Sequence, residues 1–286
     1  MNGFLNALKP PGMSSHDMVN AVRRILNIKK AGHAGTLDPA AAGVLPIAVG
    51  RATRLLEYLS LSNKSYRGEI LLGKSTVSGD LLGEITEICE VQFPPTEKIL
   101  DTINSFKGKI LQRPPIVSAI QINGKRAYDL ARKGQDFEMP LREVEIFSIE
   151  LLKTYPEKNS FLIDAEVSKG AYIRSLAVDI GEKLNVPALL KFLLRTRVGD
   201  FFIENAYSLE ELETLGETVI LKPDSYLSHI PSYELPENRR KAFLNGLSTG
   251  ERRPQPNLLT VFCNNEFLGV ARYKNGEVAP VKVYAT

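Results

Sequence analysis

Tryptophan is absent from this chain of 286 residues, and cysteine and histidine are scarce, with two and three copies. Cys89 and Cys263 lie far apart without the spacing of a metal site, which fits a protein of a reducing cytoplasm. The histidines are scattered, and neither HExxH nor CxxC occurs. We therefore expect no bound metal, and any aromatic stacking has to come from His, Tyr, Phe or Arg side chains.

Long apolar runs are missing as well. No run reaches the roughly 18 residues that a membrane-spanning helix needs. Residues 1–6 contain no basic start followed by an apolar core, so no secretion signal is expected. Together with a composition of 43% hydrophobic and 24% charged residues, these absences predict a cytoplasmic globular protein without a membrane anchor.

The net charge of +3 is small but unevenly distributed. Residues 1–64 hold eight Lys or Arg and three Asp or Glu, a net of +5, whereas the rest of the chain has a slight excess of acids. A basic N-terminal part favours an anionic partner such as nucleic acid. An ordinary solvated surface is the alternative interpretation.

Residues 32–46, with the sequence GHAGTLDPAAAGVLP, contain a single acid, Asp38. Glycine reaches backbone angles that other residues avoid and proline fixes its own, so this loop is suited to hold one side chain in a set direction. A solitary carboxylate held in this way is typical of a nucleophile or a base. The alternative is a surface turn that Asp38-Pro39 merely begins.

The spacing of apolar residues predicts an α+β fold. A helix capped by Ser14 or Ser15 is expected from the apolar stripe in residues 18–26. Strands that follow one another in sequence favour antiparallel pairing, with helices laid on the sheet. The expected strands are residues 4–8, 66–72, 84–91, 116–122, 143–153 and 160–168, and the other expected helices are residues 51–59, 96–106, 126–133 and 172–184.

A domain boundary is expected near residue 225, because residues 221–236 carry three prolines and little periodicity. Short strands separated by asparagine-containing turns are expected beyond it, at residues 258–262, 267–273 and 281–284. The sequence thus predicts a small C-terminal β module, whose thin core leans on the rest of the protein.

Residues 68–75, GEILLGKS, match the phosphate-loop pattern G-x-x-x-x-G-K-[ST]. A phosphate loop needs a helix that opens at the lysine. Here the middle residues prefer a strand, and residues 76–80 read as a turn. We therefore interpret Lys74 as a solvated or RNA-facing charge and not as part of a nucleotide site.

Five short blocks follow one another along the chain in the order found in a known enzyme family. They are Lys9-Pro10-Pro11-Gly12-Met13-Ser14-Ser15; Gly35-Thr36-Leu37-Asp38-Pro39 with Gly43 and Leu45-Pro46; Lys64-Ser65-Tyr66 with Gly73, Thr76, Asp80 and Gly83; Pro114-Pro115, Ser118-Ala119 and Lys125-Arg126-Ala127-Tyr128; and Ser168-Lys169-Gly170 with Tyr172-Ile173-Arg174. Each block is modest alone, but in this order they resemble the TruB family of pseudouridine synthases.

The resemblance implies a pseudouridine-synthase fold. A largely antiparallel mixed central sheet flanked by helices would occupy residues 1–225, and a short PUA-like RNA-binding domain would occupy residues 230–286. The implied activity is that of an isomerase, which converts the uridine at tRNA position 55 to pseudouridine by C–N cleavage, base rotation and C–C rejoining, without a cofactor. The implied partner is the T-arm stem-loop of bacterial tRNA; no protein partner is implied, and a monomer is expected. The alternative is a non-catalytic RNA-binding or tRNA-folding protein on the same scaffold.

The resemblance also implies three catalytic residues. Asp38 matches the essential aspartate of the family, with attack on uracil, attack on ribose and removal of a ribose proton all open as its first step. Arg174 would keep that carboxylate ionised and aim it. Tyr66 would lie against the uracil and exchange a proton. By residue type alone, a surface arginine is the commoner case for Arg174, and a half-buried strand tyrosine is the commoner case for Tyr66.

Further residues are implied in RNA binding. His33 would wedge into the T-loop where bases leave the stack, and Leu194 would line the uracil pocket. Residues 113–135, with a net charge of +4, would form an insertion that grips the T-loop through its phosphates. The other residues implied in RNA binding are Lys9, Lys64, Arg113, Lys125, Arg126 and Lys169.

Overall fold

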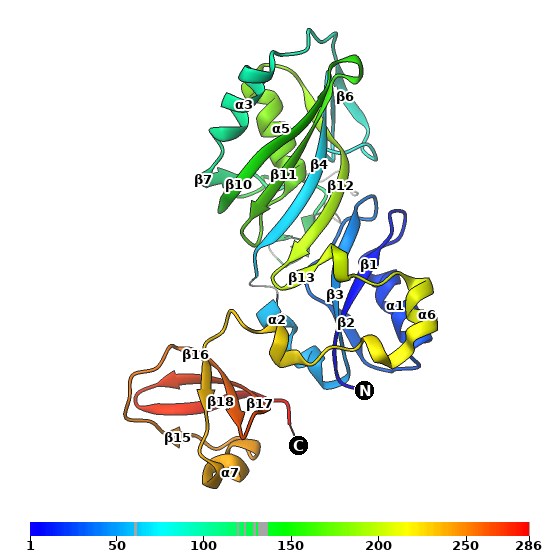
Figure 1. Ribbon diagram of the computed structural model, residues 1–286. Coiled ribbons are helices and arrows are strands. Elements are labelled where there is room, and N and C mark those ends of the chain that lie inside the picture. Colours follow the sequence, from blue (N-terminus) through cyan, green and yellow to red (C-terminus); the bar gives the residue numbers. More distant parts are fainter. Residues whose placement is uncertain (60–61, 119, 123, 128–129, 131–136, 286) are drawn as a thin grey trace.

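The computed structural model describes residues 1–286 except 60–61, 119, 123, 128–129, 131–136 and 286. The described residues form two main sheets, one in the larger N-terminal part and one near the C-terminus (Figure 1). No described helix is long and apolar enough to cross a membrane.

The large sheet of the described residues has nine strands, and its main path runs in the order β1-β3-β12-β4-β11-β10-β7. Its neighbours pair antiparallel except β3 and β12, which are parallel. The α+β class and the mixed, largely antiparallel sheet expected from the sequence are therefore confirmed. The strands on the main path are β1 (Gly3–Lys9), β3 (Ala42–Val49), β12 (Ala188–Val198), β4 (Lys64–Leu72), β11 (Ser160–Val167), β10 (Arg142–Tyr155) and β7 (Gly108–Gln112), with β2 (Ala31–His33) beside β3 and β13 (Phe201–Phe202) beside β12.

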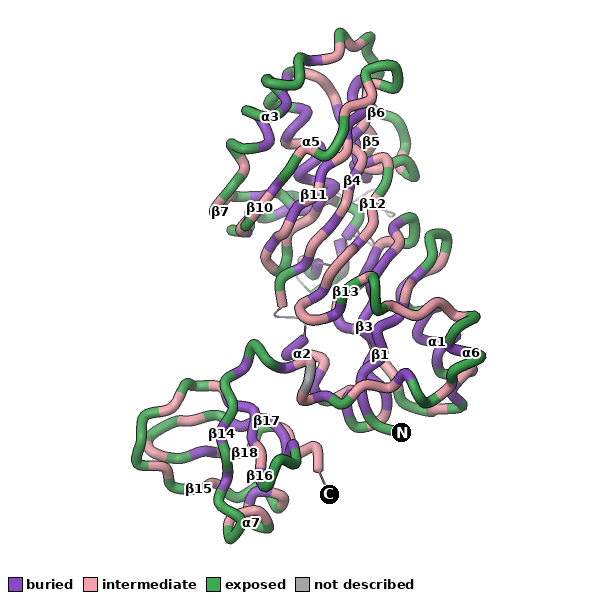
Figure 2. The backbone as a smooth tube through the Cα atoms, viewed as in Figure 1, coloured by how far each residue is buried: buried purple, intermediate pink, exposed green. Residues whose placement is uncertain are grey.

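The helices form two separate groups along this sheet. In Figure 1, α3 and α5 lie side by side, where α3 contacts β10 and α5 contacts β12 and β4; α1 lies beside β2, and α6 packs against α1. The buried residues run along the strands and the inner faces of these helices (Figure 2), because each amphipathic element turns its apolar face to the shared core. The helices are α1 (Ser15–Ile25), α2 (Leu56–Leu59), α3 (Thr96–Asn104), α5 (Ile173–Leu184), α6 (Leu209–Leu215) and α7 (Arg240–Leu244).

Strand β3 was not expected, since Gly43 and Pro46 both disfavour a strand interior. The pairing explains why Pro46 is tolerated there. Its carbonyl accepts from Ala34 N at 2.9 Å, so its nitrogen also faces the edge shared by β12 and β2. Along that edge β12 pairs at Ala42 and Gly43 and β2 starts at Ile47, so the missing N–H falls between the two partners.

The small C-terminal sheet has the order β14-β16-β17-β18-β15. Its core is continuous with the larger part, because Phe267 and Val270 share one buried cluster with Phe4, Leu55 and Phe201. This is the dependence that its small size predicts. The strands are β14 (Ser232–Glu234), β15 (Thr249–Gly250), β16 (Leu258–Cys263), β17 (Glu266–Lys274) and β18 (Glu277–Val283).

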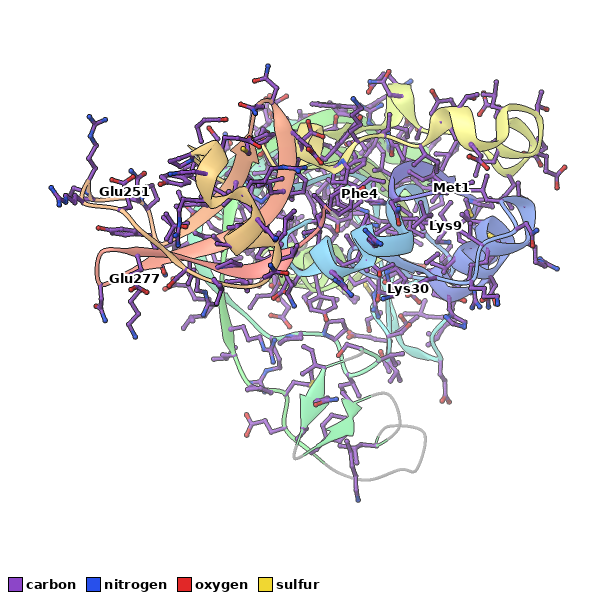
Figure 3. All side chains as sticks on the ribbon, turned by 90° about the horizontal axis from the view of Figure 1, so that it is seen from below. Met1, Phe4, Lys9, Lys30, Glu251 and Glu277 are labelled. Atoms are coloured by element: carbon purple, nitrogen blue, oxygen red, sulfur yellow. The ribbon has the colours of Figure 1, made fainter. Side chains whose placement is uncertain are left out.

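Residues 113–141 connect β7 to β10, and we call them the β7–β10 connection. Its described part includes a short hairpin of β8 (Gln121–Ile122) and β9 (Lys125–Arg126), which projects from the body of the molecule in Figure 3. The strand expected at 116–122 is wrong for residues 116–118, which pair with no strand. The helix expected at 126–133, with Tyr128, Asp129, Arg132 and Lys133, lies largely outside the described residues.

The phosphate-loop match at residues 68–75 does not form a phosphate loop. β4 continues to Leu72, and Lys74 begins a second strand, β5 (Lys74–Thr76), paired with β6 (Ile85–Ile88). A phosphate loop requires a helix N-terminus at this lysine, so the interpretation as a strand and turn is confirmed.

Candidate active site

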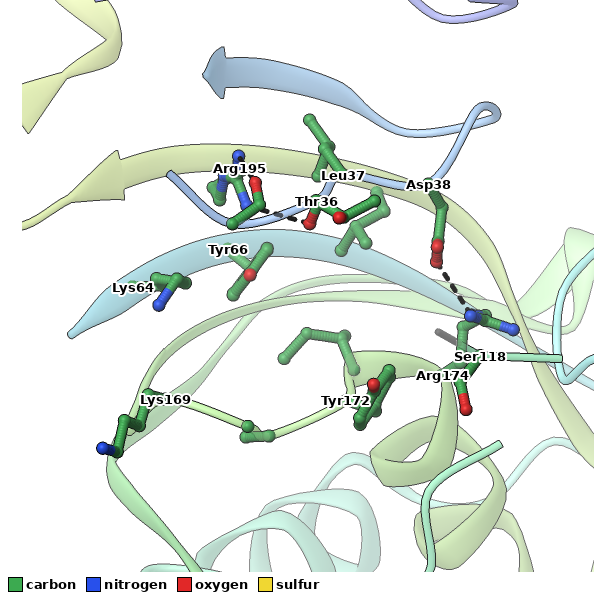
Figure 4. A pocket seen from close by; sticks show the side chains of 15 residues that line it. Thr36, Leu37, Asp38, Lys64, Tyr66, Ser118, Lys169, Tyr172, Arg174 and Arg195 are labelled. Carbon is green, nitrogen blue, oxygen red and sulfur yellow. Dashed lines mark hydrogen bonds and ion pairs between the residues drawn. The ribbon is translucent and has the colours of Figure 1, made fainter. Parts of the chain in front are cut away.

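A cavity of about 320 Å³ opens beside Asp38, at the place where the loop before β3 meets β4, β12 and the start of α5 (Figure 4). Of the residues expected to be functional, Asp38, Tyr66, Arg174, Lys64 and Lys169 line it together. The other lining residues are Gly35, Thr36, Leu37, Ser118, Gly170, Ala171, Tyr172, Ile173, Leu193 and Arg195.

Asp38 and Arg174 form an ion pair across one side of this cavity. Asp38 Oδ2 lies 2.9 Å from Arg174 Nε, and the side chains are 35% and 5% exposed, respectively. The Arg174 Nε–H makes no hydrogen bond within the described residues, so the contact acts through charge and not through an aligned hydrogen bond. The guanidinium thus places a positive charge next to the carboxylate and still leaves it open to the cavity.

The rest of the Arg174 guanidinium is fixed by backbone carbonyls. Nη1 donates to Ser78 O at 2.8 Å and Nη2 donates to Val117 O at 3.0 Å. A second carboxylate, Asp80 Oδ2, lies 3.8 Å from Nε. Asp80 is itself held by the Ser78 hydroxyl at 2.6 Å and by Leu82 N at 3.0 Å. These contacts offset the cost of burying the charge and leave the arginine one direction in which to point.

The backbone of the Asp38 loop is fastened by Ser15 at the start of α1. The Ser15 hydroxyl donates to Leu37 O and accepts from Leu37 N, both at 2.9 Å. Ser14, and not Ser15, caps the helix by accepting from Asp17 N. The expectation that one of the two serines caps α1 is thus met by Ser14, while Ser15 holds the residue before Asp38.

Arg195 of β12 fastens the same loop from the other side. This fully buried arginine donates from Nε to Val44 O at 2.7 Å and from Nη2 to Gly35 O at 3.2 Å. Gly43 runs so close to β12 that a Cβ there would lie 2.2 Å from Arg195 O, which explains the glycine in this strand. Residue type alone does not indicate a buried role for Arg195, because arginines usually lie at the protein surface.

Lys9 lies behind the loop and not on an RNA-accessible surface. It is fully buried, and its ammonium donates to Pro10 O, Met13 O and Pro39 O at 2.8, 2.7 and 3.3 Å. Burial lowers the pKa of Lys9 to about 8, with Asp38 acting in the opposite direction. The structure therefore differs from the expected RNA contact. The Lys9 ammonium joins the turn after β1, through Pro10 O and Met13 O, to Pro39 O beside Asp38.

Strand β4 places Lys64 and Tyr66 in the cavity. They are 9% and 8% exposed and share one face of the strand, since alternate residues point the same way. Lys64 Nζ donates to Ser62 O at 3.1 Å. Burial, reinforced by Arg195 and Lys169, lowers the pKa of Lys64 to about 8, whereas Lys169 is exposed at the rim.

Strand β12 places Leu193, and not Leu194, in the cavity wall. Leu193 and Arg195 both line it, and the intervening Leu194 points to the other face because side chains alternate along a strand. The resemblance had pointed to Leu194, one position away. A register shift follows between Arg195 and Arg197, so the alternation of β12 is difficult to read from sequence.

His33 does not line the cavity beside Asp38. It ends β2, pairs with Ile47 of β3 and is partly exposed. Burial, followed by the nearby Arg195, lowers the pKa of His33, so the ring is neutral near pH 7. The ring is therefore free to act by shape and stacking and not by charge.

Two of the basic residues expected in the insertion, Arg113 and Lys125, are not among the residues that line the cavity. Arg113 pairs with Glu138 at 3.0 Å and donates to Met139 O at 3.2 Å, so it joins the two ends of the β7–β10 connection. Lys125 is exposed on β9, and Arg126 belongs to the same strand. Among the described residues, no cluster of three or more His, Cys, Asp or Glu side chains is placed to hold a metal ion.

Tyr172, just before α5, adds a second phenol ring to the cavity. No role for this residue was expected from the sequence. Burial raises the pKa of its phenol, with Arg174 lowering it and Asp38 raising it less strongly. The cavity therefore combines one carboxylate, two buried guanidinium groups, two lysines and two phenol rings. This set can bind an anionic, planar ligand and act on it through Asp38.

Residues 23–173 match the sequence profile described as TruB family pseudouridylate synthase (N terminal domain). The tRNA pseudouridine synthase B of Caldanaerobacter subterraneus subsp. tengcongensis is 42% identical over 286 residues, covering 99% of both chains. The chain belongs to the TruB family. A second member of the family, the tRNA pseudouridine synthase B of Moorella thermoacetica, is 46% identical over 266 residues, covering 90% of this chain and 87% of the relative.

The fold also matches solved structures of Cbf5 complexes. A chain in the crystal structure of a Cbf5-Nop10-Gar1 complex superposes with a TM-score of 0.78 at 27% identity, over 99% of this chain and 85% of that chain. A chain in the archaeal box H/ACA sRNP Nop10-Cbf5 complex gives a TM-score of 0.75 at 25% identity, over 99% and 86%. The expected pseudouridine-synthase fold is therefore confirmed.

Proposed function

We propose that the protein isomerises the uridine at position 55, in the T-loop of tRNA, to pseudouridine. The observation that carries this proposal is the ion pair of Asp38 with the buried Arg174, at 2.9 Å, on the wall of a cavity that also contains Tyr66. The names of the curated relatives supply the tRNA substrate.

The reaction suits a site of this composition. The bond between C1′ and N1 of uridine breaks, the uracil turns, and a bond forms between C1′ and C5. The proton of C5 is lost and N1 gains one, so that the product is an isomer of the substrate. Asp38 is the group that acts on the uridine. A carboxylate in this position serves attack on uracil, attack on ribose or removal of a ribose proton.

The remaining cavity residues bind and orient the nucleotide. Arg174 holds its positive charge 2.9 Å from Asp38 Oδ2 and so orients the carboxylate. Tyr66 and Tyr172 offer flat surfaces for a base taken out of the RNA stack, and Tyr66 is placed to exchange a proton with it. Lys64, which is charged below about pH 8, and Lys169 bind the flanking phosphates. All of these are groups of the chain itself, and the reaction is proposed without a cofactor.

The division of labour along the chain follows the same proposal. Residues 1–225 form the catalytic domain, residues 113–135 grip the T-loop through Arg113, Lys125 and Arg126, and residues 230–286 form a short PUA-like RNA-binding domain. His33 stacks in the place of a displaced base. We further propose that the protein acts as a cytoplasmic monomer without a protein partner.

Mass-based mapping of pseudouridine tests this function. An unmodified tRNA transcript is incubated with the protein, and pseudouridine is located by chemical derivatisation and fragment mass. We expect modification at position 55, and none in a transcript with cytidine there. Tight tRNA binding with an unmodified position 55 would instead identify a non-catalytic RNA-binding or tRNA-folding protein and overturn the proposal.

A further inference from the structure

Four hydrogen bonds attach residues 172–175, which contain Arg174, to the last residue of β7 and to the start of the β7–β10 connection. Gln112 makes two with the backbone of Tyr172, the Ser175 hydroxyl donates to Arg113 O at 2.7 Å, and Arg174 Nη2 donates to Val117 O at 3.0 Å. The segment that leads into the connection is therefore in contact with each side of the arginine that pairs with Asp38.

Gln112 is built for this contact. Its side chain is 2% exposed; Oε1 accepts from Tyr172 N at 2.8 Å, and Nε2 donates to Tyr172 O at 3.1 Å. Gln112 ends β7, the last strand of the sheet path, and its backbone pairs with Arg142 of β10. The Gln112 side-chain amide thus bonds both the N–H and the C=O of Tyr172, the residue before α5. The first N–H groups of a helix have no partners within the helix itself, so they need acceptors of this kind.

Tyr172 connects this attachment to both the connection and the cavity. Its ring packs against a small buried cluster within the connection, formed by Ile120, Ala127 and Met139. The same residue lines the cavity beside Asp38. A displacement of the connection is consequently transmitted to Tyr172 through packing, and to Arg174 through Val117 and the backbone of α5.

We propose that Gln112 is a positioning residue, which couples the β7–β10 connection to the Arg174–Asp38 pair, so that RNA held by the connection sets the alignment of that pair. The inference rests on the proposed function, because it concerns the rate of the same reaction. Gln112 does not line the cavity, so its effect should appear in turnover and not in contacts with RNA.

The test compares two variants in the full chain with a tRNA transcript. Gln112→Met keeps the volume of the side chain but removes both hydrogen bonds to Tyr172. Gln112→Glu keeps the acceptor for Tyr172 N but turns a buried carboxylate oxygen toward Tyr172 O. We expect the single-turnover rate at saturating tRNA to fall about tenfold or more in both variants, since misplacement of a catalytic group by about 1 Å can cost a factor of about 100. The Kd for tRNA, measured with each variant combined with Asp38→Asn, should stay within about twofold.

Ser160→Ala is the matched control, because it removes a hydrogen bond of another buried side chain, from Ser160 to Glu69 Oε1 at 2.7 Å, without touching residues 172–175. Its rate should stay within about twofold of the wild type. A folded Gln112→Met with an unchanged rate, or with a loss that lies entirely in Kd, would overturn the coupling while the proposed function stands. A wild-type protein that makes no pseudouridine would overturn the proposed function itself.

Discussion

Arg174 and Asp38 share their ion pair unequally: the arginine side chain is 5% exposed and the aspartate 35%, with Nε and Oδ2 2.9 Å apart. The charge that supports the reaction is thus removed from water, while the group that performs it stays open to the cavity. Ser78 O and Val117 O fix the guanidinium from behind, so the carboxylate is the only part of the pair that a ligand can displace.

Arg174→Lys should abolish most turnover despite keeping a positive charge. An ammonium cannot reach Ser78 O, Val117 O and Asp38 together, since it lacks the planar fork of the guanidinium. We expect pseudouridine formation to fall by at least about 100-fold and the free energy of unfolding to fall by about 1–3 kcal/mol, as the carbonyls of Ser78 and Val117 lose their donors. Single-turnover kinetics and chemical denaturation measure the two effects. Near-normal turnover in the lysine variant would show that the fork geometry is unimportant.

Alanine variants of Ser14 and Ser15 distinguish a loss of stability from a misalignment of the Asp38 loop. Ser15→Ala removes both bonds to Leu37, beside Asp38, and we expect turnover to fall about tenfold together with a stability loss of about 1–2 kcal/mol. Ser14→Ala removes the cap on Asp17 N and the hydrogen bond to Asp17 Oδ2. Neither bond involves the Asp38 loop, so we expect a loss of about 1 kcal/mol without a change in turnover. Equal turnover in the two variants, measured well below their melting temperatures, would contradict the role given to Ser15.

Binding of tRNA should weaken as the pH rises through about 8, where Lys64 loses its proton. Above this value affinity should fall by up to about tenfold per pH unit. Stability should change in the opposite direction: the pKa of Lys64 in the folded protein lies below the ordinary lysine value of 10.5, so the cost of the buried charge is full below pH 8 and is relieved between pH 8 and 10.5.

Lys64→Met provides the control for this pH dependence. Its affinity for tRNA should already be lower at about pH 7 and should change little up to about pH 9, because the titrating charge is gone. Affinity titrations of both proteins across this range measure the difference. Parallel pH dependences in the wild type and the methionine variant would assign the effect to another group.

The neighbouring leucines of β12 give a prediction about the shape of the cavity. Leu193→Ala opens the wall beside Tyr66 and should lower kcat/KM by about tenfold or more. Leu194 does not line the cavity. Leu194→Ala should therefore leave kcat/KM within about threefold, although it lowers the free energy of unfolding. Steady-state kinetics on a T-arm transcript tests this order, and a larger effect at Leu194 would reverse the placement.

Much of the fold could be predicted from local patterns. Strand β4 alternates cleanly, with Tyr66, Ile70 and Leu72 buried, and α1 carries its apolar stripe behind a serine cap. β3 and β12 could not be predicted in this way. Pro46 is acceptable only because β12 and β2 meet opposite it, and the register shifts in β12 break the period of two on which a strand prediction depends.

The candidate site divides along the same line. Asp38, Tyr66 and Arg174 lie in sequence blocks that resemble those of the family, and the structure places them around one cavity. Ser15, Gln112 and Arg195 act on backbone groups that are distant in sequence. A hydrogen bond to a backbone carbonyl leaves no residue pattern at the acceptor, so only the three-dimensional structure reveals these contacts.

Asp38→Asn gives the most direct test of the account, because it changes the proposed catalytic group at nearly constant size. The variant and the wild type are incubated with the same tRNA transcript, pseudouridine at position 55 is quantified by mass, and tRNA affinity is measured in parallel. We predict no detectable pseudouridine with the variant, and a Kd within about threefold of the wild type. Full turnover by Asp38→Asn would contradict the central role of this carboxylate.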